Sequence, residues 1–524
     1  MSVELQNPIE SPSIDPSLGD RRNPSILIVG AGMSGMLMGY RLLKAGITSF
    51  EILEKSDSAV GGTWRDNTYP GLACDIPAYW YSYSFEPNPD ITHRYLRGPQ
   101  LRAYFERFAD KYGLRKYIKL NQTVESAVFE RGGWTVTTSD GTVRRAKFYV
   151  SATGILHRPS VPKFEGAETF DGPSFHSARW DHGVDLQGQR VGLIGTGSTA
   201  VQITCGLHDQ VEKLSLFQRT AHWVHPAMDK EYSALERWCA RNVPGFYKMR
   251  VLTMRVLFEK TIAAAVVGDL NLLDRFEQRC RDFLDTVEDP ELRAKLTPDY
   301  RCGCKRLIIA DDFYEAVQSP NVELLTEGIE RIESAGIRTS DGRLHELDVI
   351  VFATGFHPDA VLPIEVTGPD DRSLTQDWSA GAEGYLSVAV SGYPNFFMTL
   401  GPHSPGGNYS VIGISECQTD YIMQLIEAYR AGSFDEIDVK PQAQDRFNQA
   451  VYKQMKNTVW VSGCKSWYQD SRGIPILWPW TPKKFRRDLA RPNWSELDLR
   501  RSNAESSDLQ QVPSEKAPSR VEIG

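Results

Sequence analysis

The feature that most constrains this chain is a glycine pattern that occurs twice, each time between a strand-like and a helix-like segment. In the first copy, "SILIVGAGMSGMLMGYRLL", Gly30, Gly32 and Gly35 follow an apolar, β-branched run and precede a stretch of helical periodicity. Glycines at this spacing allow a tight turn and let backbone amides approach a pyrophosphate at the helix N-terminus. Glu54 ends the next strand-like segment, where a carboxylate can accept hydrogen bonds from ribose hydroxyls. We therefore predict a Rossmann-like unit for a dinucleotide with a free 2′-hydroxyl.

The second copy lies in "QRVGLIGTGSTAVQITCGL" and carries Gly195, Gly197 and Ala200 in a G-x-G-x-x-A arrangement. Its second strand-like segment, "KLSLFQRT", ends in Arg219 and Thr220 where the first copy has a carboxylate. A guanidinium with a hydroxyl at this position suits the 2′-phosphate of NADP, which arginine can bind with a bidentate fork. An ordinary surface arginine is the alternative interpretation. One unit that selects a 2′-hydroxyl and one that selects a 2′-phosphate together predict FAD plus NADPH.

Two further segments support a chain with two dinucleotide units. "FYVSATGILHRP" and "DVIVFATGFHP" each end a strand-like run in Ala-Thr-Gly, at residues 152–154 and 353–355. Such turns resemble the crossings between domains in flavoproteins that bind two dinucleotides, and Asp348 precedes the second turn at the spacing expected there. The predicted fold class is therefore α/β, with two Rossmann-like dinucleotide-binding domains.

Composition argues against several other classes of protein. The chain has 524 residues, of which 41% are hydrophobic, enough to bury large cores in about two to four domains. A net charge of −8 provides no basic footprint for nucleic acid. The apolar run "IAAAVV" at 262–267 is far too short to cross a bilayer, and the acidic N-terminus lacks the pattern of a signal peptide. We predict a cytoplasmic protein with no nucleic-acid, membrane or protein partner.

The cysteines form no pattern that predicts a metal site. The eight positions are Cys74, Cys205, Cys239, Cys280, Cys302, Cys304, Cys417 and Cys464. The one close pair, C-x-C at 302–304, has no second pair of metal ligands nearby. Reduced cysteines in an intracellular chain are the simplest interpretation, and no metal is predicted.

The stretch "FDGPSFHSARWD" lies between the two glycine patterns and has no periodicity that suits a long helix or a strand. It matches the pattern F-x-G-x-x-x-H-x-x-x-W-[PD] through Phe170, Gly172, His176, Trp180 and Asp181. This pattern is the fingerprint of the Baeyer–Villiger monooxygenases, which the chain resembles. Related N- and S-oxidising monooxygenases usually carry Phe or Tyr at the position of Trp180. The resemblance implies a link between the FAD and NADP domains, in which His176 is a hydrogen-bonded structural residue and not a proton donor.

A second signature of the same family resembles "GGTWRDNTYPGLACD". Its matching residues are Gly61, Gly62, Trp64, Tyr69, Pro70, Gly71 and Asp75. The segments "GCKR", "FATGF", "PNFFMTLGPHSP" and "KSWY" are also similar to that family, so the resemblance covers roughly residues 24–490. After "KSWY" many members continue with a Gly-Ala-Asn-x-Pro-Gly-Lys type of loop, whereas this chain reads "QDSRGIPILWPW". That departure resembles a subset that acts on aryl or bulky ketones.

The resemblance implies an enzyme in which NADPH-reduced FAD reacts with O₂ to form a C4a-peroxyflavin. One oxygen atom is then inserted next to a ketone carbonyl to give an ester or lactone. Arg306 matches the family's active-site arginine, a fixed cation that stabilises an anionic peroxide, and Asp75 matches the acidic residue that orients it. Lys305 matches an additional contact to the 2′-phosphate. Trp64 and Trp467 match residues at the cofactors, with Trp467 beside nicotinamide and substrate.

The expected organisation is two domains, a helical insertion in the NADP domain and two disordered tails. The tails are rich in Ser, Pro and charged residues and have little to bury. The expected boundaries are 24–158 with 375–495 for the FAD domain, 159–220 with 304–370 for the NADP domain, 225–300 for the insertion, and 1–23 and 503–524 for the tails.

Three other functions stay open at this point. A monooxygenase that oxidises nitrogen or sulfur needs a protonated, electrophilic hydroperoxide, for which Arg306 with Asp75 is not required. A disulfide reductase would need a C-x-x-C or C-x₄-C redox pair beside a glycine pattern, and the sequence has none there. A non-catalytic NADPH-sensing or scaffold protein would not need both glycine patterns together with Asp75 and Arg306. The spectrum of the reduced protein with O₂, and product analysis with a panel of ketones, would discriminate among them.

Overall fold

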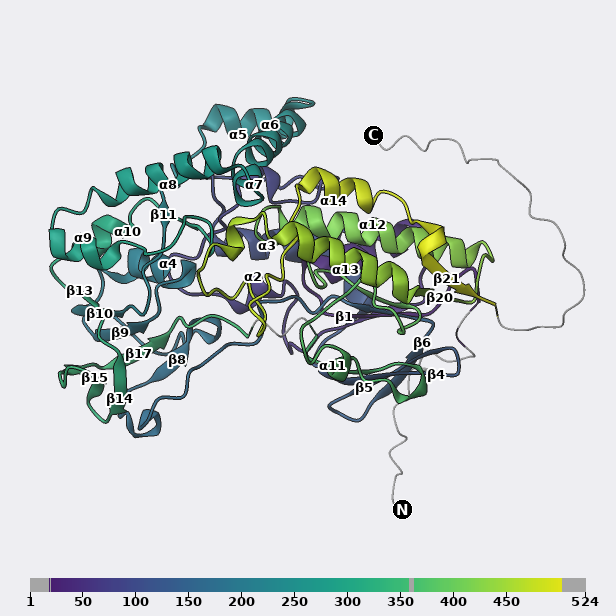
Figure 1. Ribbon diagram of the computed structural model, residues 1–524, viewed down its shortest axis with the longest axis horizontal. Coiled ribbons are helices and arrows are strands. Elements are labelled where there is room, and N and C mark those ends of the chain that lie inside the picture. The colour runs from purple at the N-terminus through teal and green to yellow at the C-terminus, as the bar shows by residue number, and fades with distance from the viewer. Residues whose placement is uncertain (1–17, 19, 358–361, 502–524) are drawn as a thin grey trace, which may run out of the picture.

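The computed structural model describes residues 18, 20–357 and 362–501 (Figure 1). Two units that each contain a parallel sheet lie side by side, and helices cover both (Figure 1). The two tails predicted to be disordered, 1–23 and 503–524, lie largely outside the described residues.

The last residues assigned to the N-terminal tail are packed against the first unit. Arg21 donates hydrogen bonds to the carbonyl oxygens of Tyr429, at 3.0 Å, and Phe434, at 2.8 Å. The Asn23 side chain accepts a hydrogen bond of 3.0 Å from the backbone amide of Ser49. Contacts with the first unit are therefore made by residues before residue 24, where we expected the first domain to start. A short polar segment of this kind gives no periodic signal, because it is held by single hydrogen bonds and not by a buried face.

The first unit is built on a five-stranded sheet in which every neighbouring pair is parallel. The strand order is β19 (Phe396–Met398), β7 (Phe148–Ser151), β1 (Ile26–Val29), β2 (Phe50–Leu53) and β3 (Ile118–Lys119). The central strands are buried on both faces, which explains their continuous apolar sequences. Because β19 comes from the last third of the chain, two distant stretches of sequence build this unit.

Helices cover the first sheet. The helix α1 (Met33–Lys44) leaves the end of β1 and packs against α12 (Val411–Arg430), the longest helix. Figure 1 shows α12, α13 (Pro441–Met455) and α14 (Pro482–Asp488) together on one side of this unit. The C-terminal part of the chain thus closes the first unit over its core.

The second unit repeats the same plan. Its strand order, again parallel throughout, is β13 (Val322–Leu325), β10 (Lys213–Phe217), β9 (Arg190–Ile194), β17 (Val349–Phe352) and β8 (Ser174–His176). The helix α4 (Ser198–Leu207) leaves the end of β9 as α1 leaves β1. These two parallel sheets with their helices confirm the predicted α/β class with two Rossmann-like units.

The fingerprint stretch belongs to this second sheet, although we expected no strand in it. Residues 174–176 pair in parallel with β17, and His176 lies opposite Phe352. Gly172 permits this approach, because a Cβ atom there would lie 2.2 Å from the carbonyl oxygen of Asp348. A three-residue strand is too short to show a period of two, which is why the sequence did not reveal it.

A smaller sheet is added to the first unit. The strands β4 (Val124–Glu130), β5 (Gly133–Thr138) and β6 (Val143–Ala146) are antiparallel, and β18 (Glu365–Thr367) joins β4 in parallel. The chain has therefore rejoined the strands of the first unit by Glu365, whereas we expected the NADP domain to extend to residue 370. No local pattern marks this boundary, because β18 is short and its partner lies far earlier in the sequence.

Between the two halves of the second unit the chain forms a group of helices. They are α5 (Ala234–Asn242), α6 (Phe246–Lys260), α7 (Ile262–Val266), α8 (Leu270–Leu284) and α9 (Pro290–Leu296). The side chains of Ser233, Asp269 and Asp289 cap the first turns of α5, α8 and α9. At the base of the group, β11 (Val224–His225) pairs with β12 (Ile308–Ile309), so the start and the end of the helical segment lie next to each other.

The other α-helices and strands complete the chain. They are the helices α2 (Thr63–Asp66), α3 (Gly98–Lys111), α10 (Phe313–Val317) and α11 (Leu374–Asp377), and the strands β14 (Ile329–Glu333), β15 (Gly336–Thr339), β16 (Leu344–Glu346), β20 (Glu436–Val439) and β21 (Leu497–Arg500). Among the described residues, no helix has both the length and the apolar content that crossing a bilayer requires.

The turn after β9 provides a test of this architecture. Gly195 has φ of +116°, and an added Cβ atom would lie 2.5 Å from the carbonyl oxygen of Ala353. Gly197 has φ of −73° and open space around it, so it serves as the matched control. We expect Gly195→Ala to destabilise the protein by about 1–3 kcal/mol and to lower its Tm, measured by circular dichroism. Gly197→Ala should melt like the parent protein, and equal melting of both variants would contradict the described turn.

Candidate active site

The first glycine turn is held by close backbone contacts. Gly30 has φ of +105°, and Gly32 begins α1. A Cβ atom on Gly30 would lie 2.5 Å from the carbonyl oxygen of Ala152, and one on Gly35 would lie 1.9 Å from the carbonyl oxygen of Gly30. Only glycine fits these positions without displacing the backbone. The amides at the start of α1 are thus exposed to a cradle that side chains do not fill.

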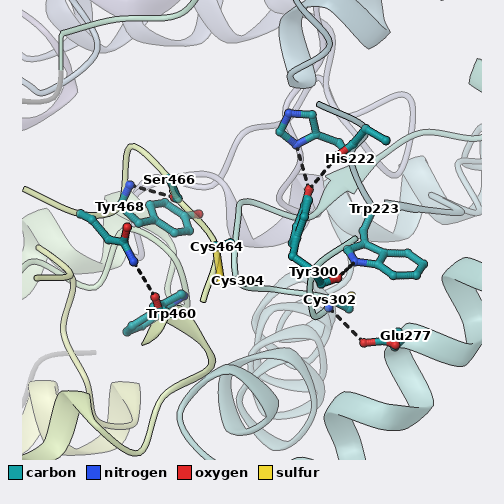
Figure 2. The surroundings of a disulfide bond; sticks show 12 residues. His222, Trp223, Glu277, Tyr300, Cys302, Cys304, Trp460, Cys464, Ser466 and Tyr468 are labelled. Carbon is teal, nitrogen blue, oxygen red and sulfur yellow. Dashed lines mark hydrogen bonds between the residues drawn. A yellow bond between two sulfur atoms is a disulfide. The ribbon is translucent and has the colours of Figure 1, made fainter. Parts of the chain in front are cut away.

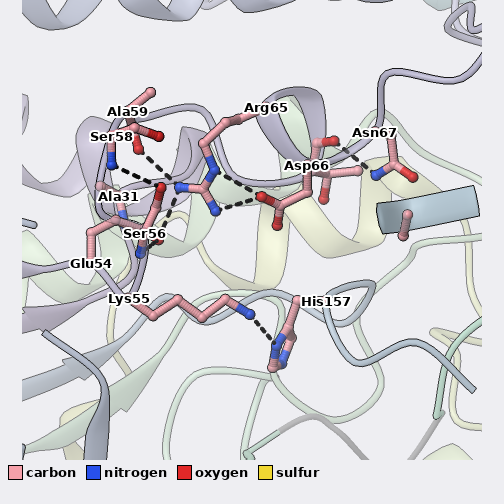
Figure 3. A network of polar contacts seen from close by, with 12 residues as sticks. Ala31, Glu54, Lys55, Ser56, Ser58, Ala59, Arg65, Asp66, Asn67 and His157 are labelled. Carbon is pink, nitrogen blue, oxygen red and sulfur yellow. Dashed lines mark hydrogen bonds and ion pairs between the residues drawn. The ribbon is translucent and has the colours of Figure 1, made fainter. Parts of the chain in front are cut away.

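Glu54, the carboxylate at the end of β2, is buried and lies at the centre of a polar network (Figure 3). Its Oε2 accepts a hydrogen bond of 2.8 Å from the amide of Ala31, inside the glycine turn. Its Oε1 accepts bonds of 2.9 Å from the amide of Ser56 and from Arg65. We expected this carboxylate to bind ribose, and its remaining acceptor capacity leaves room for a hydroxyl.

Arg65 is a site residue that the sequence reasoning missed. It pairs with Glu54 at 2.9 Å and with Asp66 at 2.7 Å, and its side chain is only 8% exposed. Burial alone would lower the pKa of Arg65, but the two carboxylates outweigh it, and the pKa is raised. The sequence signal for Arg65 was its place directly after the tryptophan of "GGTWR". A buried carboxylate such as Glu54 requires a cationic partner, and Arg65 is the cation in that signature.

The second signature lies against the first glycine turn. The amide of Gly61 donates a bond of 3.0 Å to the carbonyl oxygen of Ala31. A Cβ atom on Gly62 would lie 3.1 Å from the Cα atom of Gly32, so the two glycine segments are in close contact. Trp64 follows on α2, half-buried, and its indole N–H donates a bond of 3.0 Å to the hydroxyl of Tyr81. Trp64 therefore lies at the edge of the first cradle.

The second glycine turn repeats the geometry of the first. Gly195 approaches the backbone of the second Ala-Thr-Gly turn, Gly197 begins α4, and Ala200 is buried on that helix. At the end of β10, Arg219 is exposed, and no hydrogen bond or ion pair within the described part of the chain engages it. The carbonyl oxygen of Thr220 accepts a bond of 2.8 Å from the hydroxyl of Thr196, which fixes this end of the strand.

Basic side chains gather beside the second turn. The pKa of Lys305 is lowered by burial first and then by repulsion from Arg219, which places the two cations near each other. The pKa of His222 is lowered to about 4 by burial and by the same two cations. The Lys305 ammonium lies 4.7 Å from the ring centre of Tyr300, whose hydroxyl contacts the His222 ring at 3.4 Å. Such a cluster of like charges favours a bound anion.

Arg306 and Asp75 form an ion pair that joins the two units. The Nε atom of Arg306 donates to Oδ2 of Asp75 at 3.1 Å, and a second guanidinium nitrogen donates to the same oxygen. The Asp75 charge raises the pKa of Arg306, so the guanidinium stays cationic. Both side chains remain partly accessible, at 35% and 26% exposure. The structure thus brings together the two residues that the sequence singled out as catalytic.

A disulfide fixes the segment that carries Arg306. Cys304 is bonded to Cys464, with Cα atoms 6.2 Å apart, although we expected every cysteine to be reduced (Figure 2). The prediction failed because 160 residues separate the two cysteines, so sequence spacing carried no sign of their proximity. The bond ties the turn before Lys305 to the loop that contains Trp467.

The loop after Cys464 completes this side of the site. Trp467 is half-buried and its ring centre lies 4.5 Å from that of Tyr468. Tyr468 is buried and interacts with the Arg306 guanidinium. Burial raises the pKa of Tyr468, and the nearby Arg306 charge opposes this rise. Tyr468 is a further residue that the sequence reasoning did not place in the site.

The fingerprint residues lie at the edge of the second sheet. His176 is buried and its Nδ1 accepts a bond of 3.1 Å from the amide of Ala178; burial lowers the His176 pKa to about 4. Trp180 packs edge-on against Phe175 at 5.2 Å. Asp181 is exposed and accepts a bond from the amide of Gly183, while Phe170 packs on a separate apolar cluster. None of these side chains contacts the Arg306 pair in the described structure, so their arrangement fits a positioning role.

Comparison with known proteins places this architecture in a family. Residues 23–361 match the model of the flavin-binding monooxygenase-like family. An uncharacterized monooxygenase of Mycobacterium tuberculosis is 46% identical over 92% of this chain and 97% of its own length. A Baeyer–Villiger monooxygenase of Streptomyces coelicolor is 39% identical over 91% of this chain and 92% of its own.

Solved structures agree with this match. An oxidized steroid monooxygenase bound to NADP superposes with a TM-score of 0.83 at 28% identity, covering 91% of this chain and 99% of that one. The structure of OTEMO in complex with FAD and NADP superposes with a TM-score of 0.82 at 25% identity over the same shares. The chain therefore belongs to the flavin-binding monooxygenase-like family and, within it, to the Baeyer–Villiger monooxygenases.

Proposed function

We propose that this protein binds FAD and NADPH and inserts one oxygen atom from O₂ next to the carbonyl of a ketone, giving an ester or lactone. The observation that carries this proposal is the ion pair of Arg306 with Asp75, partly accessible and placed where the two units meet. A fixed cation of this kind is what addition to a carbonyl group requires.

The first cradle suits FAD. Its glycine turn presents the amides at the start of α1 to a pyrophosphate, and a side chain at Gly30 or Gly35 would collide with backbone. Glu54 stands at the ribose position, with Arg65 compensating its charge. Trp64, at the edge of this cradle, would border the bound flavin. When bound and reduced, the flavin supplies the oxygen-activating chemistry.

The second cradle suits NADPH. Gly195 and Gly197 present the start of α4 to a pyrophosphate in the same way. Arg219 and Lys305 provide two cations for the 2′-phosphate, and Thr220 lies beside them. Binding of a dianion would relieve the repulsion that lowers the Lys305 pKa. Trp467 would border the nicotinamide.

Arg306 acts on the ketone. Its guanidinium stays charged because Asp75 compensates it, and two donors on one carboxylate fix its orientation. Negative charge that develops on the substrate oxygen is then stabilised by a cation already in place. Asp75 is the residue that orients it, and Tyr468 also interacts with the guanidinium. Oxidation of nitrogen or sulfur would leave this pair without a role, and we do not favour it.

The fingerprint residues would act as a hinge between the two domains, through which binding of the coenzyme in the NADP domain affects the FAD domain. His176, at the end of an edge strand beside the second Ala-Thr-Gly turn, remains neutral near pH 7 because burial lowers its pKa to about 4. A neutral, buried ring suits a structural hinge better than proton transfer.

Arg219 tests the assignment of the coenzyme. Charge-assisted hydrogen bonds contribute about 1.5–3 kcal/mol each. We expect Arg219→Ala to raise the KM for NADPH about tenfold or more and to leave that for NADH nearly unchanged. Lys213, at the other end of β10, is the control, since Lys213→Ala should change neither the KM for NADPH nor the KM for NADH. Equal weakening toward both coenzymes would remove Arg219 from the phosphate site.

Arg306 tests the reaction itself. With purified holoenzyme, NADPH and a panel of ketones, the parent protein should form ester or lactone. Arg306→Ala should bind both cofactors but form product at least about a hundredfold more slowly, because one fixed stabilising donor is worth about 2.7–4 kcal/mol. Arg306→Lys should restore activity only in part, since a flexible ammonium does not reproduce the planar fork. An alanine variant with nearly parental product formation would contradict the role of Arg306.

The disulfide provides a separate test of how Arg306 is held. Without reductant the denatured protein should show six thiols, and after reduction eight. The double variant Cys304→Ser/Cys464→Ser should still reduce flavin with NADPH but should lower the ratio of ester formed to NADPH consumed about tenfold, because the guanidinium is less well positioned. Cys239→Ser, on α5, is the control. Unchanged coupling in the double variant would mean that the bond does not position Arg306.

A further inference from the structure

The helix α6 is apolar on both of its faces, yet only one face is covered. On the inner face Tyr247 is buried, and the rings of Phe246 and Phe258 lie 6.5 Å and 5.1 Å from those of Tyr79 and Trp80. On the outer face the uncovered apolar side chains are Met249, Leu252, Val256 and Leu257. Large apolar side chains on an uncovered helix face require an explanation, because such residues are normally buried.

The neighbouring helix α5 extends this uncovered surface. Leu235 and Trp238 on α5 and Val243 in the connecting turn are exposed. Together with the four residues of α6 they form the α5–α6 face, whose members are between 39% and 71% exposed. In Figure 1 the two helices project from the upper edge of the molecule, beyond the units that they adjoin. A group of large apolar side chains on a projecting element indicates a contact surface.

Most charges around this face are paired, and the unpaired ones that the structure describes there are basic. Residues 234–260 contain six Lys and Arg and two Glu, in a chain whose net charge is −8. Both glutamates are paired, Glu236 with Arg250 at 2.8 Å and Glu259 with Arg486 at 2.6 Å. The four arginines of this segment each lie within 4 Å of a carboxylate, which leaves Lys248 and Lys260 as its cations without an ion pair in the described structure. Lys248 and Lys260 are exposed in the same helical row as Leu252 and Val256, one at each end of it.

We propose that the α5–α6 face binds the surface of an anionic lipid bilayer, with both helices lying in the interface and nothing spanning it. Exposed Leu, Met and Val beside Trp and flanked by lysines are the composition of interfacial helices, and the basic side chains are attracted by anionic headgroups. The sequence-based expectation of no membrane partner rested on the lack of a spanning segment, which this mode of binding does not require.

A second copy of the chain fits this face less well. In a symmetric dimer the same patch would face itself, which would set the row from Lys248 to Lys260 against an identical row and bring like charges together. An anionic surface matches both the apolar and the basic side chains. This inference is independent of the proposed oxygenation, because binding is measured without turnover.

The test uses the full-length holoenzyme and vesicles in a sedimentation assay. One set of vesicles contains phosphatidylcholine alone, and the other contains about one third phosphatidylglycerol. We expect sedimentation with the anionic vesicles, little with the neutral ones, and release at about 0.5 M NaCl. Leu252→Glu/Val256→Glu should weaken binding at least about tenfold. The control Val143→Glu/Val161→Glu changes two equally exposed valines outside the face and should bind like the parent.

Several outcomes would overturn the proposal. Sedimentation that is the same with and without anionic vesicles would do so, as would binding that the Leu252→Glu/Val256→Glu variant retains in full. A parent protein that is dimeric by light scattering, binds no vesicles and becomes monomeric in this variant would assign the face to a second copy. Equal rates of NADPH oxidation in the parent and both variants would establish that the substitutions leave the fold intact.

Discussion

The structure depends on one close backbone contact that occurs once in each unit. The glycine turn after the first strand of each unit lies against the Ala-Thr-Gly turn that ends another strand, so close that a Cβ atom on Gly30 or Gly195 would be 2.5 Å from a carbonyl oxygen. This contact positions the start of the following helix at the edge of the sheet, where its backbone amides are available to a pyrophosphate. The two dinucleotide cradles therefore follow from the absence of a side chain at a few positions.

The reactive centre, by contrast, depends on contacts between distant parts of the chain. Asp75 comes from the first unit, Arg306 from the return into the second, and Tyr468 from the C-terminal loop. The disulfide of Cys304 with Cys464 links the last two of these segments covalently. A guanidinium that is already held in place loses little entropy when charge develops beside it, so that positioning contributes to the rate. Small shifts between the units would thus affect this centre before they affected either cradle.

The sequence predicted what local chemistry determines and missed what tertiary contact determines. The sequence predicted features that are encoded over a few neighbouring residues. These are both glycine turns, the acidic and basic ends of their second strands, and the helices of residues 225–300. The pairing of Arg65 with Glu54, the disulfide and the edge strand at 174–176 were not predicted, since each depends on a partner far away or on too few residues to show a period. That one face of α6 stays uncovered was also invisible, because periodicity locates apolar faces without showing what covers them.

The two units share a fold and differ in charge at the end of the second strand, as the proposed FAD and NADPH sites require. In the first, the carboxylate of Glu54 is compensated by Arg65, so the end of the second strand is nearly neutral and carries acceptors for hydroxyl groups. In the second, Arg219 and Lys305 stand near each other, and the Lys305 pKa is lowered by burial first and then by repulsion from Arg219. A 2′-phosphate placed in the first unit would meet a buried carboxylate, and a plain ribose in the second would leave that repulsion unrelieved. Under the proposed assignment the same backbone geometry would hold two different dinucleotides in one chain, because the charge at a single strand end would distinguish them.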